Sequence, residues 1–584
     1  MVAVLFNRLT ATIAPLLLLP PPLFRHGSPS MQIPNFSGGH TFVVHGDVLS
    51  LSADALLVPT RNLNNKKWFP SGPPDGALQP PREDFTADRR VIRVEGTSST
   101  APPVWLSLLD GRFAPEERKI DGDAPELAWF LEAAEQFLAE AHADLREREL
   151  PPRCGRAKHV LALPIVGTGK GGARDASGEI IAALLQAVDE YARANDIDVA
   201  LVVKNDRMFS AAQAKRRQLS QRWEEKLGTR LAAAAEELAD LAASERLCIF
   251  LGAGVSVGAG LPEWKELLAA LASRQEVPLD DDEIRQLATL GLPDQAAVVA
   301  SKISSGLSSG DGPLASLVVD ELSSPWYSIT HGLLAGLPIS ACVTTNYDNL
   351  FETAWRAADK QFNVLPYETQ PSDRFILKLH GDLQRPQDIV LTRSQMFDSR
   401  EQRKALSGIV QTMLLTKHLL FLGFSLQDPN FSEVAGEVRR ARRESSSDGG
   451  SGDSEPFGTL LCLHNRPFLA ELWPELNTLP MDLTDEQNAE QRVPNTECAR
   501  LVEILLDKVS LDSSTTTRHL LDGAFSGVFS PQEDALKEHL QAFRERVSKN
   551  ELARQSSGFS VVRQTLRRLG DLEGEPADPE APDL

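Results

Sequence analysis

Two stretches of this chain each run from an apolar strand pattern directly into a glycine-rich loop and then into a helical pattern. The first is HVLALPIV followed by GTGKGG, residues 159–172, and the second is CIFLGAGVSVGAG, residues 248–260. Such strand–loop–helix units build parallel sheets, because two parallel neighbours need a long crossover between them, usually a helix. We therefore predict an α/β fold with two parallel-sheet domains.

The length of the chain supports this division. Its 584 residues exceed what one hydrophobic core usually serves, so two or three domains are expected. We expect a first domain over 31–208, a helical connector over 209–243, a second domain over 244–510, and a helical C-terminal segment with an acidic disordered tail over 511–584. We interpret residues 1–30 as a disordered leader or a mis-assigned start, with a secretory signal as the alternative.

The composition excludes several classes of protein. The formal net charge of −21, from 60 basic and 81 acidic residues, argues against a nucleic-acid-binding surface spread over the whole molecule. The apolar run near the N-terminus is too short to span a membrane as a helix. The five cysteines are far apart and form no CxxC pair, so we expect no zinc or other metal site. We expect a cytoplasmic protein without nucleic-acid or membrane partners.

The glycine loop at 252–260 has more than one interpretation. Glycines at a strand-to-helix junction let a phosphate approach the backbone, but the dinucleotide fingerprint G-x-G-x-x-G is missed by one residue. Gly254–Gly258 also matches G-x-S-x-G, which would make Ser256 a serine-hydrolase nucleophile. We expect the helix only after Pro262, which places Ser256 away from the helix start. A glycine turn without any ligand stays open as well.

Three further strand patterns end in polar residues. These ends read TTNYD at 344–348, KLHGD at 378–382 and GFSLQDPNF at 423–431. Ligands of open parallel sheets bind beyond the carboxyl ends of the strands. We therefore predict one pocket shared by the glycine loop and the convergent side chains of Asn346, Asp348, His380 and Ser425.

The motifs GAGVSVGAGLPEW, TTNYDNLFE, KLHGD and LGFSLQDPNF together resemble the sirtuin-like NAD-cleaving fold, in particular the bacterial branch found in anti-phage defence systems such as Thoeris. The resemblance covers roughly residues 244–480 and implies a Rossmann-type domain with NAD as its substrate. Each motif alone is weak evidence, but four in the same order as in the family make the resemblance specific.

The resemblance also implies individual roles. The implied contacts with NAD are Gly252, Ala253, Gly254 and Ser256 at the pyrophosphate and ribose, Asp348 at the nicotinamide carboxamide, and Gly423 and Ser425 at the adenosine ribose. Asn346 is implied to orient the nicotinamide ribose and the attacking water, and His380 to act as the general base.

The residue types suit the implied chemistry. Nicotinamide leaves as a neutral base from a cationic centre, so the site must hold the ribose still and position a water or a base. The amide of Asn346 donates and accepts hydrogen bonds without titrating, and the imidazole of His380 can take up a proton near neutrality. The alternatives are a helix cap at 346–348 and a packed, hydrogen-bonded histidine at 380.

One departure from the family bears on the reaction. Deacetylase sirtuins carry a paired-cysteine zinc module, and no such cysteine pairs occur in this sequence. This favours hydrolysis of NAD to nicotinamide and ADP-ribose over acyl-lysine chemistry. Two alternatives stay open: ADP-ribosyl transfer to a protein, and a nucleotide-binding module without turnover.

The first domain has a resemblance of its own. FVVHGDVLSLSADALLVPT and VLALPIVGTGKGGA resemble a macro domain, the α/β module that binds ADP-ribose, over about 40–208. The resemblance implies that Asp47 binds adenine and that Gly167 and Gly169 belong to a phosphate loop. The segment VPTRN replaces the family's Asn-rich segment, which favours ligand binding over hydrolysis of ADP-ribosyl bonds. The alternative is a scaffold for oligomers.

Together these inferences give one hypothesis. The chain is a defence effector whose sirtuin-like domain hydrolyses NAD, gated by an ADP-ribose-type signal nucleotide at the macro-like domain. Depletion of NAD is toxic, so we expect an inactive resting state, in a homo-oligomer.

Overall fold

The computed structural model describes most of the chain outside its two ends. The described residues are 34, 36–60, 82–86, 88–96, 100–108, 126–168, 174–219, 222–274, 277, 279–306, 312–402, 404–445, 455–485, 492–514 and 517–571. The expected leader, Gly169 and the acidic tail lie outside these residues.

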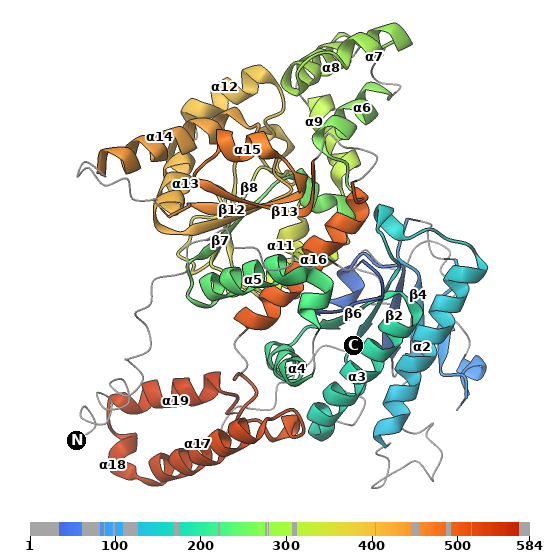
Figure 1. The fold of residues 1–584 in the computed structure, drawn as a ribbon, viewed down its shortest axis with the longest axis vertical. Coiled ribbons are helices and arrows are strands. Elements are labelled where there is room, and N and C mark those ends of the chain that lie inside the picture. Colours follow the sequence, from blue (N-terminus) through green and yellow to red (C-terminus); the bar gives the residue numbers. More distant parts are fainter. Residues whose placement is uncertain are drawn as a thin grey trace.

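Two sheets organise the structure (Figure 1). The first has the order β1 (Thr41–His45), β6 (Asp198–Val203), β5 (Val160–Pro164), β2 (Ala55–Thr60), β4 (Val104–Leu108) and β3 (Val91–Arg93). The second has the order β13 (Leu476–Asp485), β12 (Gly458–Asn465), β11 (His418–Leu422), β7 (Leu247–Leu251), β8 (Ala341–Thr344), β10 (Phe375–Lys378) and β9 (Asn363–Leu365). Of the described strand pairs, β3–β4 is antiparallel and the others are parallel. The predicted α/β fold with two parallel-rich sheets is confirmed.

Helices connect and cover these strands. Those before β8 are α2 (Leu127–Glu147), α3 (Ser177–Asn195), α4 (Asp206–Gln218), α5 (Trp223–Ala243), α6 (Trp264–Ala272), α7 (Asp281–Leu287), α8 (Leu292–Gly306), α9 (Gly312–Leu322) and α10 (Ile329–Gly336). Those after it are α11 (Leu350–Ala357), α12 (Arg393–Gln402), α13 (Lys404–Thr416), α14 (Pro429–Ser445), α15 (Pro467–Leu472), α16 (Asn495–Ser513), α17 (Pro531–Lys549), α18 (Glu551–Arg554) and α19 (Gly558–Arg568).

A shared layer of helices lies between the two sheets. One continuous hydrophobic cluster joins the inner faces of both sheets with residues of α5, α10 and α16. The outer face of the first sheet packs on α2 and α3, and the outer face of the second packs on α13 and α14. The strands alternate accordingly: Ile249 of β7 belongs to the shared cluster and its neighbour Phe250 to the outer one.

The expected connector is part of this packing. Two helices, α4 and α5, occupy the predicted region, and α4 packs on β1 and α3 while α5 packs along α16. Two strands, β9 and β13, were not predicted. The sequence of β13 contains Pro480, which argues against a central strand; the structure places β13 at the edge of its sheet, where proline is tolerated.

Helix α16 binds the first domain through buried ion pairs. They join Arg500 to Asp198, Glu503 to Arg156, and Asp507 to Arg216, and each of these side chains is at most 8 % exposed. Spacings of three and four residues place the three α16 partners on one face of the helix. Removing one partner of a buried pair typically costs 3–5 kcal/mol, so we expect this face to hold the two domains together firmly.

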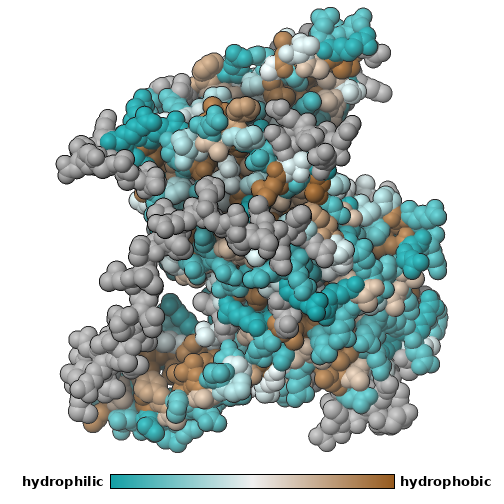
Figure 2. Space-filling view, viewed as in Figure 1, coloured by the Kyte–Doolittle hydropathy of each residue, from teal (hydrophilic) through white to brown (hydrophobic). Residues whose placement is uncertain are grey.

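The C-terminal segment forms a helical hairpin that projects from the body of the molecule (Figure 1). It begins at the predicted capping box, where the Glu533 amide donates to Ser530 Oγ and the Ser530 amide donates to the Glu533 carboxylate. Hydrophobic side chains gather between its helices, at the lower left of Figure 2. Leu552 and Val561 remain 81 % and 63 % exposed, so the hairpin buries its apolar residues less completely than either domain.

Candidate functional site

The second sheet has a topological switch point at β7. The chain proceeds from β7 to β8 on one side, and later crosses to β11 on the other side. The loops that leave β7 and β11 therefore diverge at this point and leave a crevice at the carboxyl edge, where ligands of open α/β sheets bind. All four polar strand ends predicted from the sequence lie at this edge, since β7, β8, β10 and β11 are parallel neighbours.

Glycines allow two loops to touch at the switch point. The Gly252 amide donates to the carbonyl of Leu422 over 2.9 Å, and the Gly254 amide donates to the carbonyl of Gly423 over 3.1 Å. A side chain on Gly252 would overlap the Gly423 carbonyl, and Gly423 itself has a φ of +60°. The close approach brings the predicted loop of 252–254 and the predicted Gly423 together.

Asn346, Asp348 and Ser256 form a hydrogen-bonded group beside these glycines. Ser256 Oγ donates to Asp348 Oδ2 over 2.9 Å, and Asn346 Nδ2 donates to the Gly252 carbonyl over 3.1 Å. Asn346 is 8 % exposed, yet its Oδ1 has no hydrogen-bond partner within the described part of the chain. Because a buried acceptor without a partner is costly, this oxygen marks a position where a ligand hydroxyl or a water can donate.

His380 follows the neighbouring strand, β10, two residues after its end at Lys378. Lys378 of β10 pairs with Thr344 of β8, so His380 and Asn346 each follow the paired position by two residues. Neighbouring strands run about 4.8 Å apart, so the two residues extend from adjacent points of the same edge. His380 is 6 % exposed.

Asp428 is the partner of His380. Its Oδ2 lies 2.9 Å from His380 Nε2, and its Oδ1 accepts the amide of Phe431 over 2.8 Å at the start of α14. Although burial raises it, the His380 imidazole lowers the pKa of Asp428 below its usual range. A carboxylate in this position holds the ring of His380 in a fixed orientation through its Nε2 atom.

The remaining residues predicted to contact NAD in the second domain, Ala253 and Ser425, do not belong to this hydrogen-bonded group. Ala253 starts a short 3-10 helix, Ala253–Ala259, at the end of β7. Ser425 is exposed, and its Oγ lies 3.4 Å from the amide of Gln427. Both residues follow strand ends at the switch point.

The serine-hydrolase interpretation of Ser256 is not supported. As expected, α6 begins after Pro262, at Trp264, and Ser256 lies inside the preceding 3-10 helix. A serine nucleophile is usually paired with a histidine, whereas the partners of Ser256 Oγ are the carboxylate of Asp348 and the amide of Asn346.

The predicted residues of the first domain lie at a different edge. Asp47 follows β1; its Oδ1 accepts the Leu49 amide over 3.0 Å and its Oδ2 pairs with Lys204 over 2.9 Å. Gly167, with a φ of +82°, packs against the ring of Phe130. The structure therefore assigns packing and local bonds to Asp47 and Gly167, and their role in ligand binding stays a prediction.

Tyr327 from the second domain covers the loop that contains Asp47. Its hydroxyl accepts the Asp47 amide over 3.0 Å, and a side chain on Gly46 would overlap it. The Tyr327 side chain is fully buried, and its backbone pairs with the loop at 50–52. The next residue, Ser328, lies beside Gly258 of the glycine loop, so Tyr327 and Ser328 link the loop that contains Asp47 to the glycine loop.

Sequence reasoning missed three of these residues. Asp428 and Lys378 lie inside quoted motifs, SLQDPNF and KLHGD, but neither motif indicates that these side chains contact other strand ends. Tyr327 lies in no motif at all. The one available signal was the place of Asp428, six positions after the end of β11, and it points to His380 only once the strand order is known.

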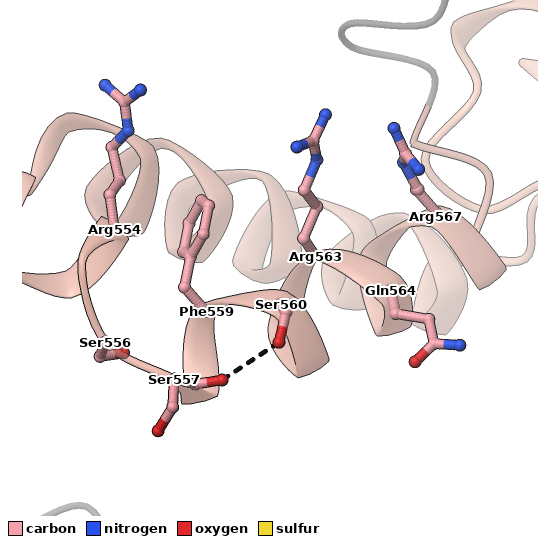
Figure 3. Close-up of a pocket in the computed structure, with 8 residues that line it drawn as sticks. All are labelled: Arg554, Ser556, Ser557, Phe559, Ser560, Arg563, Gln564 and Arg567. Atoms are coloured by element: carbon pink, nitrogen blue, oxygen red, sulfur yellow. Dashed lines mark hydrogen bonds between the residues drawn. The ribbon is translucent and has the colours of Figure 1, made fainter.

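A separate hollow of about 480 Å³ lies on the C-terminal hairpin. Its lining includes Arg554, Arg563 and Arg567, whose guanidinium groups point to the same side, together with Phe559 (Figure 3). The hairpin is remote from the second sheet (Figure 1), so this hollow is not part of the site at the strand ends.

The described residues contain neither a metal-ligand cluster nor a membrane-spanning helix. Within them, no group of three or more His, Cys, Asp or Glu side chains is arranged to hold a metal ion. Of the helices described, none combines the length and apolar character needed to cross a membrane.

Comparison with known proteins points to the same region. Residues 340–450, from β8 to α14, match the SIR2-like domain. The chain is 33 % identical over 204 residues to "NAD(+) hydrolase ThsA" of Enterococcus faecium, covering 34 % of this chain and 40 % of that protein. It is 32 % identical over 208 residues to the protein of the same name from Bacillus cereus, with the same two shares.

A third relative is more distant. The chain is 26 % identical over 223 residues to "Defense-associated sirtuin 2" of Bacillus subtilis, which covers 36 % of this chain and 21 % of that protein. The chain thus spans about two fifths or less of the length of these curated relatives. The match at residues 340–450 supports a sirtuin-like domain in the second half of the chain, and a macro domain in the first half stays a prediction.

Proposed function

We propose that this protein hydrolyses NAD at the carboxyl edge of the second sheet. The bond between nicotinamide and C1′ of the ribose breaks, and the electron pair leaves with the nicotinamide nitrogen. A water oxygen then bonds to C1′ and loses a proton, so that NAD and water give nicotinamide, ADP-ribose and a proton. Because nicotinamide is a good leaving group, the main task of the site is to position the ribose and the water.

The residues of the edge divide this task. The glycine loop at 252–254 lets the pyrophosphate approach the backbone closely, with Gly423 and Ser425 at the end of the neighbouring strand for the adenosine ribose. Asn346 Oδ1 accepts a hydrogen bond from the nicotinamide ribose or the water, and Asp348 faces the carboxamide. His380 takes up the proton, and Asp428 stabilises the resulting imidazolium.

One observation carries the proposal. A buried amide oxygen without a described partner and a histidine paired with a carboxylate follow adjacent strands, β8 and β10, at the sheet edge that contains the topological switch point. The names of the relatives, which include an NAD(+) hydrolase and a defence-associated sirtuin, make NAD hydrolysis in antiviral defence the best-supported activity for this arrangement.

Regulation by the first domain forms the second half of the proposal. A resting effector needs a way to keep hydrolysis off, and the contact of Tyr327 with Asp47 and of Ser328 with Gly258 connects the two edges. An ADP-ribose-type nucleotide that displaces Tyr327 would move α10 against the glycine loop. We place this gating, and a homo-oligomeric form in the bacterial cytoplasm, within the proposal.

The experiment follows nicotinamide and ADP-ribose after purified protein is mixed with NAD, with and without candidate signal nucleotides. We expect nicotinamide release in at least one condition, with ADP-ribose in equal amount. Asn346→Ala and His380→Ala should each abolish release while the thermal midpoint stays within a few degrees of wild type. Full activity in both variants would refute the assignment of the site.

The same assay separates hydrolysis from transfer. With NAD labelled in the adenosine ribose, hydrolysis leaves the label in free ADP-ribose. Label retained on protein after denaturation would instead support ADP-ribosyl transfer. Tight NAD binding without nicotinamide release under any condition would support a binding module.

A further inference from the structure

Lys378, the last residue of β10, contacts both segments that carry the proposed catalytic side chains. Its ammonium is fully buried and donates to the carbonyl of Asp348 over 2.8 Å and to that of Tyr347 over 3.1 Å. These carbonyls belong to the turn that contains Asn346. The lysine on one strand therefore holds the backbone of the turn that leaves the neighbouring strand.

The same ammonium holds the His380 loop. It lies 3.0 Å from Asp382 Oδ2, two residues beyond His380, and 2.9 Å from Glu352 Oε1 on α11. Asp382 also accepts the Gln384 amide over 2.7 Å and the side-chain amide of Asn349 over 3.0 Å. One buried cation thus joins the turn with Asn346, the loop with His380 and the first turn of α11.

The charges around Lys378 keep it protonated. Burial alone lowers its pKa, but the carboxylates of Glu352 and Asp382 raise the pKa above the usual value. A protonated amine has three hydrogens to donate, and four oxygen atoms lie within 3.1 Å of Nζ. Because these contacts come from three segments, losing the ammonium frees all three at once.

We infer that Lys378 is a positioning residue for NAD hydrolysis, which sets the distance and orientation between Asn346 and His380. The inference rests on the proposed function for the reaction that is served, while its physical content, the ordering of two loops by one cation, stands on the contacts alone. Lys378 does not touch the proposed ligand position, because its ammonium is enclosed beneath the turn and has no exposed surface.

The test compares variants that separate charge balance from positioning. The double variant Lys378→Met with Glu352→Leu removes the cation and one of its two carboxylate partners, which limits the damage to folding. Glu352→Gln removes one charge but leaves the contacts of Lys378 with both catalytic segments. Arg90→Met in the first domain is the matched control, since Arg90 is also a buried cation, 4 % exposed, bonded to Glu132 and the Trp129 carbonyl.

Steady-state nicotinamide release gives the activity readout. We expect the double variant to lose about 100-fold in kcat while KM changes by less than about fivefold, since small misplacement of reacting groups acts mainly on the chemical step. Glu352→Gln and Arg90→Met should keep kcat within about threefold of wild type. A double variant that folds with wild-type kcat would overturn the inference.

Amide hydrogen exchange supplies a readout that needs no turnover. We expect exchange at 345–350 and at 379–383 to rise in the double variant at least tenfold, with no change in these segments for Arg90→Met. Unchanged exchange in both segments would overturn the inference whether or not the wild type hydrolyses NAD. Absence of nicotinamide release from the wild type, together with raised exchange in the variant, would instead refute the proposed function alone.

A variant with a milder change covers failure of the double variant to fold. Asp382→Asn weakens the link of Lys378 to the His380 loop and keeps the link to the Asn346 turn. We expect a loss of about tenfold in kcat and raised exchange at 379–383 only. Wild-type values for both measurements would contradict the positioning role.

Discussion

The two parallel-rich sheets present carboxyl edges of opposite character. At the edge of the second sheet, Asn346 Oδ1 is buried and has no partner in the described chain. At the edge of the first sheet, Asp47 has its carboxylate bonded to Lys204 and the Leu49 amide, and the Tyr327 hydroxyl bonds its backbone. The same architecture therefore gives one edge with free bonding capacity and one edge that the neighbouring domain has closed.

The difference shows how strand-end motifs should be interpreted. A polar residue after a strand can serve a ligand, or it can serve the chain itself as a cap or an interface contact. What separates the two cases here is hydrogen-bond satisfaction: Asp47 is satisfied within the chain, and Asn346 is not. The resemblance to known motifs predicted ligand binding for both residues and could not separate the two cases.

The largest effect that tests the comparison is on turnover. Asn346→Ala should lower kcat for nicotinamide release by at least about 100-fold, since loss of one preorganised hydrogen-bonding group at a reacting centre costs on that order. Asp47→Ala should change basal kcat by less than about threefold. Equal losses in the two variants, measured by nicotinamide release, would show that the two edges do not differ in the proposed way.

Opening the closed edge should have the next largest effect. Tyr327→Ala removes a fully buried aromatic ring, so we expect about 3 kcal/mol of lost stability and, by calorimetry, new or tighter binding of ADP-ribose. Tyr327→Phe, the control, should lose about 1 kcal/mol from the hydroxyl's hydrogen bonds. The edge is already open if the wild type binds ADP-ribose as tightly as Tyr327→Ala does and if this binding depends on Asp47.

The glycine contact at the open edge can be tested by adding one carbon. Gly252→Ala places a methyl group against the Gly423 carbonyl and should cost about 1–3 kcal/mol, together with most NAD turnover. Gly408 in α13 has open space around a methyl group, and Gly408→Ala should stabilise the helix by up to about 1 kcal/mol. Thermal midpoints that shift in the same direction for both variants would argue against the close approach of the two loops.

The smallest effect is on the pH dependence of stability, through the contact between His40 and Asp507 of α16. Burial, followed by the nearby Lys226, lowers the pKa of His40 from 6.5 to about 3, and its Nε2 lies 2.7 Å from Asp507 of α16. As pH falls below 6.5 the unfolded chain binds a proton at this histidine and the folded protein does not, so stability declines. Between pH 7 and pH 5 this contributes about 2 kcal/mol.

His40→Gln removes that contribution while keeping one donor and one acceptor. We expect the variant to be less stable than wild type at pH 7 and the difference in thermal midpoint to shrink by pH 5. A difference that is constant across this range would show that His40 is not held neutral. The contact of His40 with Asp507 would then not account for a loss of stability in acid.

Much of the open edge was predictable because strand ends follow from chain order. Parallel strands place their carboxyl ends together, so Asn346, His380 and Gly423 could be assigned to one edge before any coordinates were known. Pairing of side chains could not be assigned in this way. Whether His380 contacts Asp428, or Lys378 contacts Asp382, depends on loop conformations that motifs do not specify.

The closed edge was predicted less well, for a related reason. Tyr327 reaches Asp47 across 280 positions of sequence, and the buried pairs of α16 join residues about 290 to 350 positions apart. Arginine and aspartate are also common on solvated surfaces, and no periodic pattern in the sequence distinguishes a residue of a buried ion pair from a surface residue. Packing between domains is decided by surface shape, which the one-dimensional pattern of apolar residues does not contain.

The buried charges of α16 also limit how such a protein can evolve. Arg500, Glu503 and Asp507 each require an opposite charge from the other half of the chain. Recombination that joined this half of the chain to a different N-terminal module would leave up to three charged side chains without partners in an apolar layer. The two halves are therefore expected to be inherited as a unit, with substitutions at these six positions changing together across descendants.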